Sequence, residues 1–164
     1  MTAGVGFTVK VKGNDLLIKS ADGSSALLID LATVDGGINI DDRVIKAGAI
    51  AGSDKSDVLI GGYGDNSLWG GIGGRDTLIG ELGVNEFYYG LGNGIDVITN
   101  ADDDDVVNLL GISLDDIRTI DVSDTSTTLK FVDGGRLNIE GTDELTFNVE
   151  GNSLKLDRKS KSLK

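Results

Sequence analysis

The chain has 164 residues and a formal net charge of −12, from 27 acidic and 15 basic side chains. We do not expect nucleic acid as a partner, because phosphate binding needs a basic surface. The absence of cysteine and histidine excludes disulfides, thiolate metal sites and the commonest general base. Carboxylate and carbonyl oxygens remain, and they suit a hard cation.

Turn-forming residues dominate the composition. Only five of the 27 acidic residues are glutamate and the rest are aspartate, beside 25 glycines, no proline and 5% aromatic residues. Aspartate and glycine favour turns over helices, so the composition predicts a turn-dense chain with a small core. No apolar run approaches the ~20 residues of a membrane span. Met1 to Phe7 lacks the features of a signal peptide, so we expect any export signal to lie elsewhere.

Residues 1–50 are predicted to form an N-terminal β-meander. Phe7 to Lys12 alternates apolar and polar residues, and apolar runs follow at residues 16–18 and 26–29. The segments 13–15 and 21–23 between these runs contain the glycine, asparagine and aspartate that favour turns.

Residues 51–99 repeat with a period of nine and then ten residues. Each repeat has a glycine-rich half, an acidic or amide residue and, two residues later, a large side chain. The acidic or amide positions are Asp57, Asn66, Asp76, Glu86 and Asp96, and the large positions are Leu59, Leu68, Leu78, Tyr88 and Ile98. Because side chains alternate along a strand, the pattern predicts tight turns joined by three-residue parallel strands with the large side chain inward.

These repeats resemble the repeats-in-toxin (RTX) family of hemolysin-type calcium-binding repeats, whose unit is G-G-x-G-x-D-x-U-x with U large and apolar. Residues 61–69 match this unit except that Asn66 replaces aspartate. The resemblance covers about 50 residues. It implies a short parallel β-roll at residues 51–100, with calcium between turns of the same side, and a place in a large bacterial secreted or cell-surface protein.

The resemblance also implies the calcium ligands. One side of the roll would carry Asp57, Asp76 and Asp96, with Asp76 shared between two sites. The same turns supply the further candidate ligands Asp54, Gly73, Gly74, Gly92 and Gly94. The other side would carry Asn66 and Glu86, and we expect it to bind weakly or not at all because a charge is lost at Asn66. The alternative is a metal-free protein in which these residues form ordinary solvated turns.

Residues 101–164 are predicted to form a C-terminal β-capping segment, so that the chain is one composite domain. The run Asp102 to Asp105 favours a solvated loop, although Asp105 is a weaker ligand candidate for the second side. Ser113 favours a single helical turn. Strand-like runs follow at residues 128–132, 136–139, 145–149 and 154–156, and the basic tail from residue 155 favours a solvated terminus over a site for an acidic surface.

Trp69 and Tyr89 occupy the last strand position of two repeats that share a sheet, so we expect them to point outward one rung (about 4.8 Å) apart. Burial under the flanking meanders is the favoured interpretation, and a carbohydrate-binding strip is the alternative.

The leading functional hypothesis is a non-catalytic module that folds on binding extracellular calcium. The alternative is a calcium-dependent carbohydrate-binding or targeting module attached to an enzyme. The chain ends resemble each other at residues 12–18 and 150–156, which favours neighbouring modules of a tandem array as further partners. Catalysis is not expected, because the sequence has neither a Gly-x-Ser-x-Gly motif nor histidine. An aspartate pair that hydrolyses a glycosidic bond is a less supported alternative.

Overall fold

The computed structural model describes an all-β protein, as the repeats and the strand-like runs of the sequence predict. It describes the backbone of residues 7–12, 15–20, 26–30, 38–40, 43–45, 49–62, 64–159 and 162–163, and the side chains of residues 49–62 and 64–159. Strands dominate this part of the chain, which also contains one 3₁₀ turn at Leu114–Asp116. Within the same residues, no helix has the length and apolarity needed to cross a membrane.

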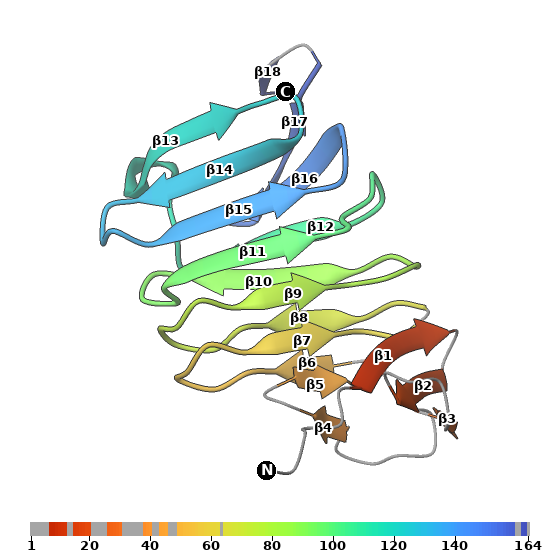
Figure 1. Cartoon of the computed structure of the whole chain (residues 1–164). Helices are drawn as coiled ribbons and strands as arrows, with labels where there is room; N and C mark the ends of the chain where they lie inside the picture. Colours follow the sequence, from red (N-terminus) through yellow and green to blue (C-terminus); the bar gives the residue numbers. More distant parts are fainter. Residues whose placement is uncertain are drawn as a thin grey trace.

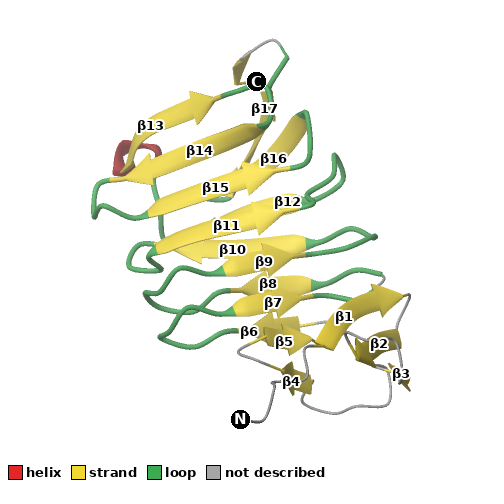
Figure 2. Ribbon diagram, viewed as in Figure 1, coloured by secondary structure: helices red, strands yellow, loops and turns green. Residues whose placement is uncertain are grey.

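Successive central strands lie alternately in two mixed sheets (Figures 1 and 2). The eight-stranded sheet contains, in parallel, β7 (Val58–Ile60), β9 (Thr77–Ile79) and β11 (Ile95–Thr99). The seven-stranded sheet contains, in parallel, β6 (Ala49–Ala51), β8 (Ser67–Trp69), β10 (Glu86–Gly90) and β12 (Val106–Leu110). The chain therefore coils through both sheets and makes a turn after each strand.

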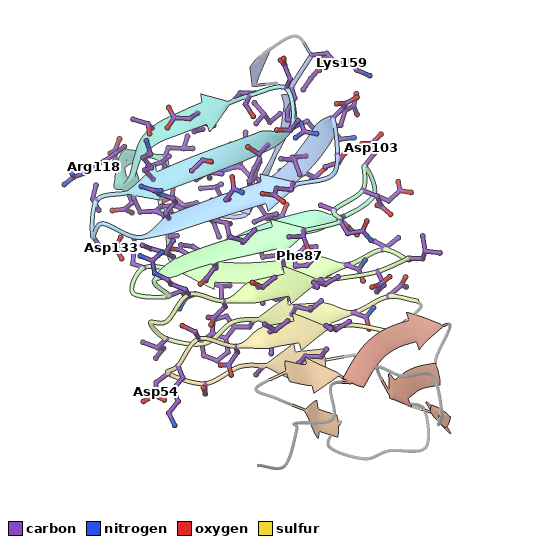
Figure 3. All side chains as sticks on the ribbon, viewed as in Figure 1. Asp54, Phe87, Asp103, Arg118, Asp133 and Lys159 are labelled. Carbon is purple, nitrogen blue, oxygen red and sulfur yellow. The ribbon has the colours of Figure 1, made fainter. Side chains whose placement is uncertain are left out.

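The core lies between the two sheets and follows the strand alternation. The middle residue of β7, β8 and β9 is buried between two half-buried neighbours, because successive side chains point to opposite faces. Leu59, Leu78 and Ile98 form one buried column, and Leu68, Phe87 and Val107 form the facing column. Phe87 lies near the middle of the stack (Figure 3).

The prediction that Tyr88 points inward was wrong. Phe87 pairs in register with Leu68, and Tyr88 pairs with Trp69, so Tyr88 belongs to the outer face and is only half-buried. The physical reason is the length of the preceding turn. Residues 80–85 form a six-residue turn, so the inward position comes one residue earlier than a uniform ten-residue step predicts.

The C-terminal strands extend both sheets instead of forming one continuous meander. Their bounds are β13 (Ile117–Val122), β14 (Ser126–Phe131), β15 (Arg136–Glu140), β16 (Glu144–Val149), β17 (Asn152–Asp157) and β18 (Ser162–Leu163). β15 pairs parallel with β11, and β16 pairs parallel with β12. The remaining pairings are antiparallel hairpins. Ile139 and Phe147 thereby continue the buried columns of Ile98 and Val107, which explains why the expected meander is divided between two sheets.

The N-terminal strands β1 (Phe7–Lys12), β2 (Asp15–Ser20) and β3 (Ala26–Asp30) form an antiparallel three-stranded sheet. This arrangement confirms the meander predicted there, although the turn residues 13–14 and 21–23 lie outside the described residues. β4 (Ile38–Ile40) pairs antiparallel with β5 (Arg43–Ile45), which pairs parallel with β7. The eight-stranded sheet therefore begins before residue 51.

Candidate metal centre

The turns of the coil form two opposite edges. We call the turns 52–57, 70–76 and 91–94, together with Asp96 near the start of β11, the first edge, since each turn runs from the seven-stranded to the eight-stranded sheet. The turns 61–66, 80–85 and 100–105 run the other way and form the second edge. Asp54 and Asp103 mark the first and second edges in Figure 3.

The first edge brings Asp57, Asp76 and Asp96 together as one column. The Asp57 N–H donates to Asp76 Oδ1 at 2.9 Å, and the Asp76 N–H donates to Asp96 Oδ1 at 3.0 Å. Asp76 and Asp96 are each only 1% exposed. The carboxylates of Asp76 and Asp96 are thus each held by a backbone N–H of the preceding turn. Asp76 lies between the other two residues of the column.

The second carboxylate oxygens of this column differ in their partners. Asp57 Oδ2 accepts hydrogen bonds from the N–H and the hydroxyl of Ser53, at 2.7 and 2.8 Å. Asp76 Oδ2 is buried and has no hydrogen-bond partner among the described residues. An unsatisfied buried carboxylate oxygen is energetically costly, so a cation beside this atom would lower the free energy of the folded state.

Glycine lets the turns approach this oxygen. A Cβ added at Gly70 would lie 2.3 Å from Asp76 Oδ2, and one added at Gly74 would lie 2.5 Å from the Lys55 carbonyl oxygen. The candidate glycines Gly73, Gly74, Gly92 and Gly94 all have positive φ angles. These turns therefore require glycine for conformation as well as for space. The side chain of Asp54, another candidate ligand, is exposed in the turn 52–57.

Burial changes the ionisation of the column. The pKa of Asp76 is raised to about 6, mainly by desolvation and also by the negative charge of Asp57, against the lowering effect of the hydrogen bond from the Asp57 N–H. Desolvation likewise raises the pKa of Asp96 to about 7. Within the described part of the chain, the ion pairs of lysine and arginine are with Asp121 and Asp143. The column therefore has no protein cation to balance it among these residues.

We expect calcium-free protein to lose stability as the pH rises from about 4 to about 7. The folded-state pKa values of Asp76 and Asp96 lie above the unfolded value of 3.8, so the folded state holds protons that the unfolded state releases. The loss should be on the order of several kcal/mol, since pKa values of about 6 and about 7 in the folded state replace 3.8 in the unfolded state and one pKa unit corresponds to about 1.4 kcal/mol. Urea unfolding in EGTA across this range measures it. An Asp76→Asn/Asp96→Asn variant should show a flatter profile, and an equally steep one would refute the assignment.

The oxygen atoms of the first edge suit a cation that binds backbone carbonyls as well as carboxylates. In the described residues no three or more acidic side chains converge to form a metal-binding group. A cation at the first edge would therefore be held by carboxylates from two adjacent turns together with turn carbonyls. Calcium takes roughly six to eight oxygen ligands, including backbone carbonyls, whereas zinc prefers nitrogen and sulfur ligands.

At the second edge, the structure corrects the prediction for Glu86. The Asn66 N–H donates to Asn85 Oδ1 at 3.2 Å, and the Asn85 N–H donates to Asp105 Oδ1 at 2.7 Å. Asn85, which the repeat pattern does not single out, therefore takes the position expected for Glu86. Glu86 is exposed on the first residue of β10, where its carboxylate accepts a hydrogen bond from the Tyr88 hydroxyl.

Asp105 differs from its neighbours in the acidic run. It is 2% exposed, and its Oδ2 accepts a hydrogen bond from the Asp102 N–H at 3.0 Å. Burial raises its pKa. Asp103 and Asp104 are exposed, so only the last residue of the run joins the column of the second edge.

The expected outward pair Trp69 and Tyr89 is also corrected. Tyr89 is 1% exposed, stacks on Phe131 with ring centroids 4.9 Å apart, and donates its hydroxyl proton to the Gly94 carbonyl at 2.8 Å. It is buried in the core between the sheets, because β10 has five residues and both Phe87 and Tyr89 point inward. Trp69 is half-buried, with its Nε1–H donating to Asn93 Oδ1 at 3.2 Å.

A scan against protein-family models and a search of curated proteins both find no match for this sequence.

Proposed function

We propose that the protein is a non-catalytic calcium-binding module whose first edge holds calcium between adjacent turns. The buried and unpartnered Oδ2 of Asp76 carries this proposal. The resemblance of residues 51–99 to RTX repeats supports it independently, since in that family the same positions of a β-roll bind calcium. Asp57, Asp76 and Asp96 would supply the carboxylates, and the glycine turns would supply carbonyls.

Calcium would stabilise the fold by neutralising the column. Carboxylates of adjacent turns repel one another without a cation, by an amount on the order of a kcal/mol or more at the dielectric of a protein surface. A bound cation removes this repulsion and adds its binding free energy to folding. Extracellular calcium modules have dissociation constants of roughly 10⁻⁴ to 10⁻³ M. Such an affinity would suit a secreted or cell-surface protein that folds after export.

Thermal unfolding tests the proposal. About 10 mM calcium lies roughly 10- to 100-fold above such dissociation constants, and it should stabilise the protein by about 1.4–2.7 kcal/mol per site. We expect the midpoint Tm to rise by several degrees relative to EGTA, with a smaller response to magnesium because magnesium gives up its water ligands reluctantly. An identical Tm in EGTA and calcium would contradict the proposal.

A second candidate function is binding of a neutral polysaccharide on the outer face of the seven-stranded sheet. Trp69, Tyr88, Asn108 and Asn148 are register neighbours across four strands and are all half-buried. Asn148 Nδ2 donates to Asn108 Oδ1 at 2.8 Å. An open groove of about 470 Å³ adjoins the two asparagines. Aromatic faces beside amides offer stacking and hydrogen bonding to sugar rings.

Affinity electrophoresis in gels that contain neutral polysaccharides tests this candidate. The wild type should be retarded, and Tyr88→Ala should restore its mobility, because the variant removes an aromatic surface without opening the core. A matched control is Thr77→Ala on the outer face of the other sheet. Equal mobility of the wild type in gels with and without polysaccharide would eliminate this function.

A further inference from the structure

The second edge contains an oxygen cage that is already filled by a side chain. Asn66 Nδ2 lies 2.8, 2.7 and 3.1 Å from the carbonyl oxygens of Gly62, Gly64 and Gly80. A fourth oxygen, Asn85 Oδ1, lies 3.0 Å away. Oxygens that converge in this way on one point, two of them carbonyls of the same turn, form the kind of environment that a hard cation occupies.

Asn85 repeats the arrangement one turn further along the edge. Its Nδ2 lies 3.2 Å from the carbonyl oxygens of both Glu81 and Gly83, and 3.1 Å from Asp105 Oδ1. The spacing is the same as for Asn66, with carbonyls four and two residues earlier and the side-chain oxygen of the next turn. The carboxamide orientation follows from these partners, because the Asn85 nitrogen faces acceptors while its oxygen faces Asn66 donors.

The corresponding place on the first edge holds an oxygen instead of a nitrogen. A Cβ added at Gly61 would lie 2.8 Å from Asn66 Nδ2, and one added at Gly80 would lie 2.6 Å from Asn85 Nδ2. The equivalent Cβ at Gly70 would lie 2.3 Å from Asp76 Oδ2. The same location in the turn therefore holds a satisfied donor at Asn66 and Asn85, whereas at Asp76 it holds an acceptor that has no partner among the described residues.

We infer that the carboxamide nitrogens of Asn66 and Asn85 take the place of calcium on the second edge, so that this edge folds without a metal ion. The contrast with the first edge rests on the proposed function. The hydrogen-bonded column of Asn66 and Asn85 does not depend on it. A neutral NH₂ group satisfies turn carbonyls without adding a charge. The column ends at Asp105, whose carboxylate accepts the N–H groups of Asn85 and Asp102. Asn66 and Asn85 are thus the residues that restrict calcium to one edge.

Equilibrium dialysis with radioactive calcium tests the inference through the number of ions bound at saturation. Asn66→Asp/Asn85→Asp should bind at least one ion more than the wild type, because each substitution exchanges a donor for a ligand oxygen. A matched control is Asn152→Asp/Ser153→Asp, which adds the same charge to an exposed hairpin and should leave the number unchanged. An unchanged number of ions in the folded Asn66→Asp/Asn85→Asp variant overturns the inference.

Hydrogen exchange of the wild type in saturating calcium gives a second and independent readout. The side-chain NH₂ groups of Asn66 and Asn85 should exchange at least about 100-fold more slowly than that of the exposed Asn152, as expected for buried, bonded groups. Equal exchange rates would overturn the inference. Because it uses the wild type, this measurement remains decisive even when Asn66→Asp/Asn85→Asp does not fold. A wild type that binds no calcium but keeps both amides protected would refute the proposed function while supporting the metal-free second edge.

Discussion

Asp76→Asn should abolish most of the calcium response and at the same time stabilise the calcium-free protein. Asp76 is the central member of the first-edge column, in contact with the turns of both Asp57 and Asp96, so its loss affects both candidate sites. At calcium concentrations 100-fold above the dissociation constant, each lost site removes about 2.7 kcal/mol of stabilisation. In EGTA the substitution removes a buried charge and places an NH₂ group where Oδ2 has no partner, so the Tm should rise.

The opposite signs in EGTA and in calcium make this test specific. A substitution that merely damaged the fold would lower the Tm in both buffers. Asp124→Asn is the matched control, because Asp124 is an exposed aspartate outside the column and its substitution should leave both Tm values within experimental error. An Asp76→Asn protein that keeps the calcium response of the wild type would show that Asp76 is not a ligand.

Phe87→Ala should be among the most destabilising single substitutions, at about 3–5 kcal/mol, because it opens a cavity between the sheets. Phe87 is 1% exposed and lies in the buried column between Leu68 and Val107. Tyr88→Ala at the next position should cost only about 1 kcal/mol, since Tyr88 is half-buried on the outer face. Urea unfolding of both variants in calcium measures the difference. A larger loss for Tyr88→Ala would contradict the register of β10.

The stacking of the first-edge residues follows from the resemblance to RTX repeats together with their spacing, and hydrogen bonds of the structure link them. Asp57, Asp76 and Asp96 are separated by 19 and 20 residues, so a coil of two strands per turn stacks them whatever the details of the turns. The structure stacks the three residues, the last of them in β11, with hydrogen bonds from backbone N–H groups to carboxylates between them. Periodicity does not reveal that Ser53 bonds to Asp57 Oδ2 whereas no described residue bonds to Asp76 Oδ2, since this depends on the length and residues of each turn.

The second edge was misassigned because the aromatic run Phe87-Tyr88-Tyr89 fits two strand frames equally well. Choosing Tyr88 as the inward residue led to Glu86 as the residue of the column, whereas the structure has Phe87 and Asn85. A usable signal was present in the sequence. Asn85 follows Asn66 by 19 residues, the same distance that separates Asp57 from Asp76. Equal spacing along both edges is expected of a coil, and it favours the frame that the structure adopts.

The C-terminal strands show a different limit of sequence reasoning. Their residue ranges followed from alternation and from the turn at residues 133–135, where Gly134 has a positive φ angle. The strands with which they pair could not be predicted in this way. A strand such as β15 carries no local signal that it pairs in parallel with β11 as well as antiparallel with β14. This choice depends on burial of Leu137 and Ile139 against residues about 40 positions earlier. Such pairing is decided by tertiary packing.

A crystal structure determined with calcium tests the assignment of calcium to the first edge. Cations are expected between Asp57 and Asp76 and between Asp76 and Asp96, with Asp76 contacting both. None is expected beside Asn66 and Asn85, whose NH₂ groups should keep their carbonyl partners. Crystals grown in millimolar calcium in which Asp76 Oδ2 faces no cation would contradict this assignment.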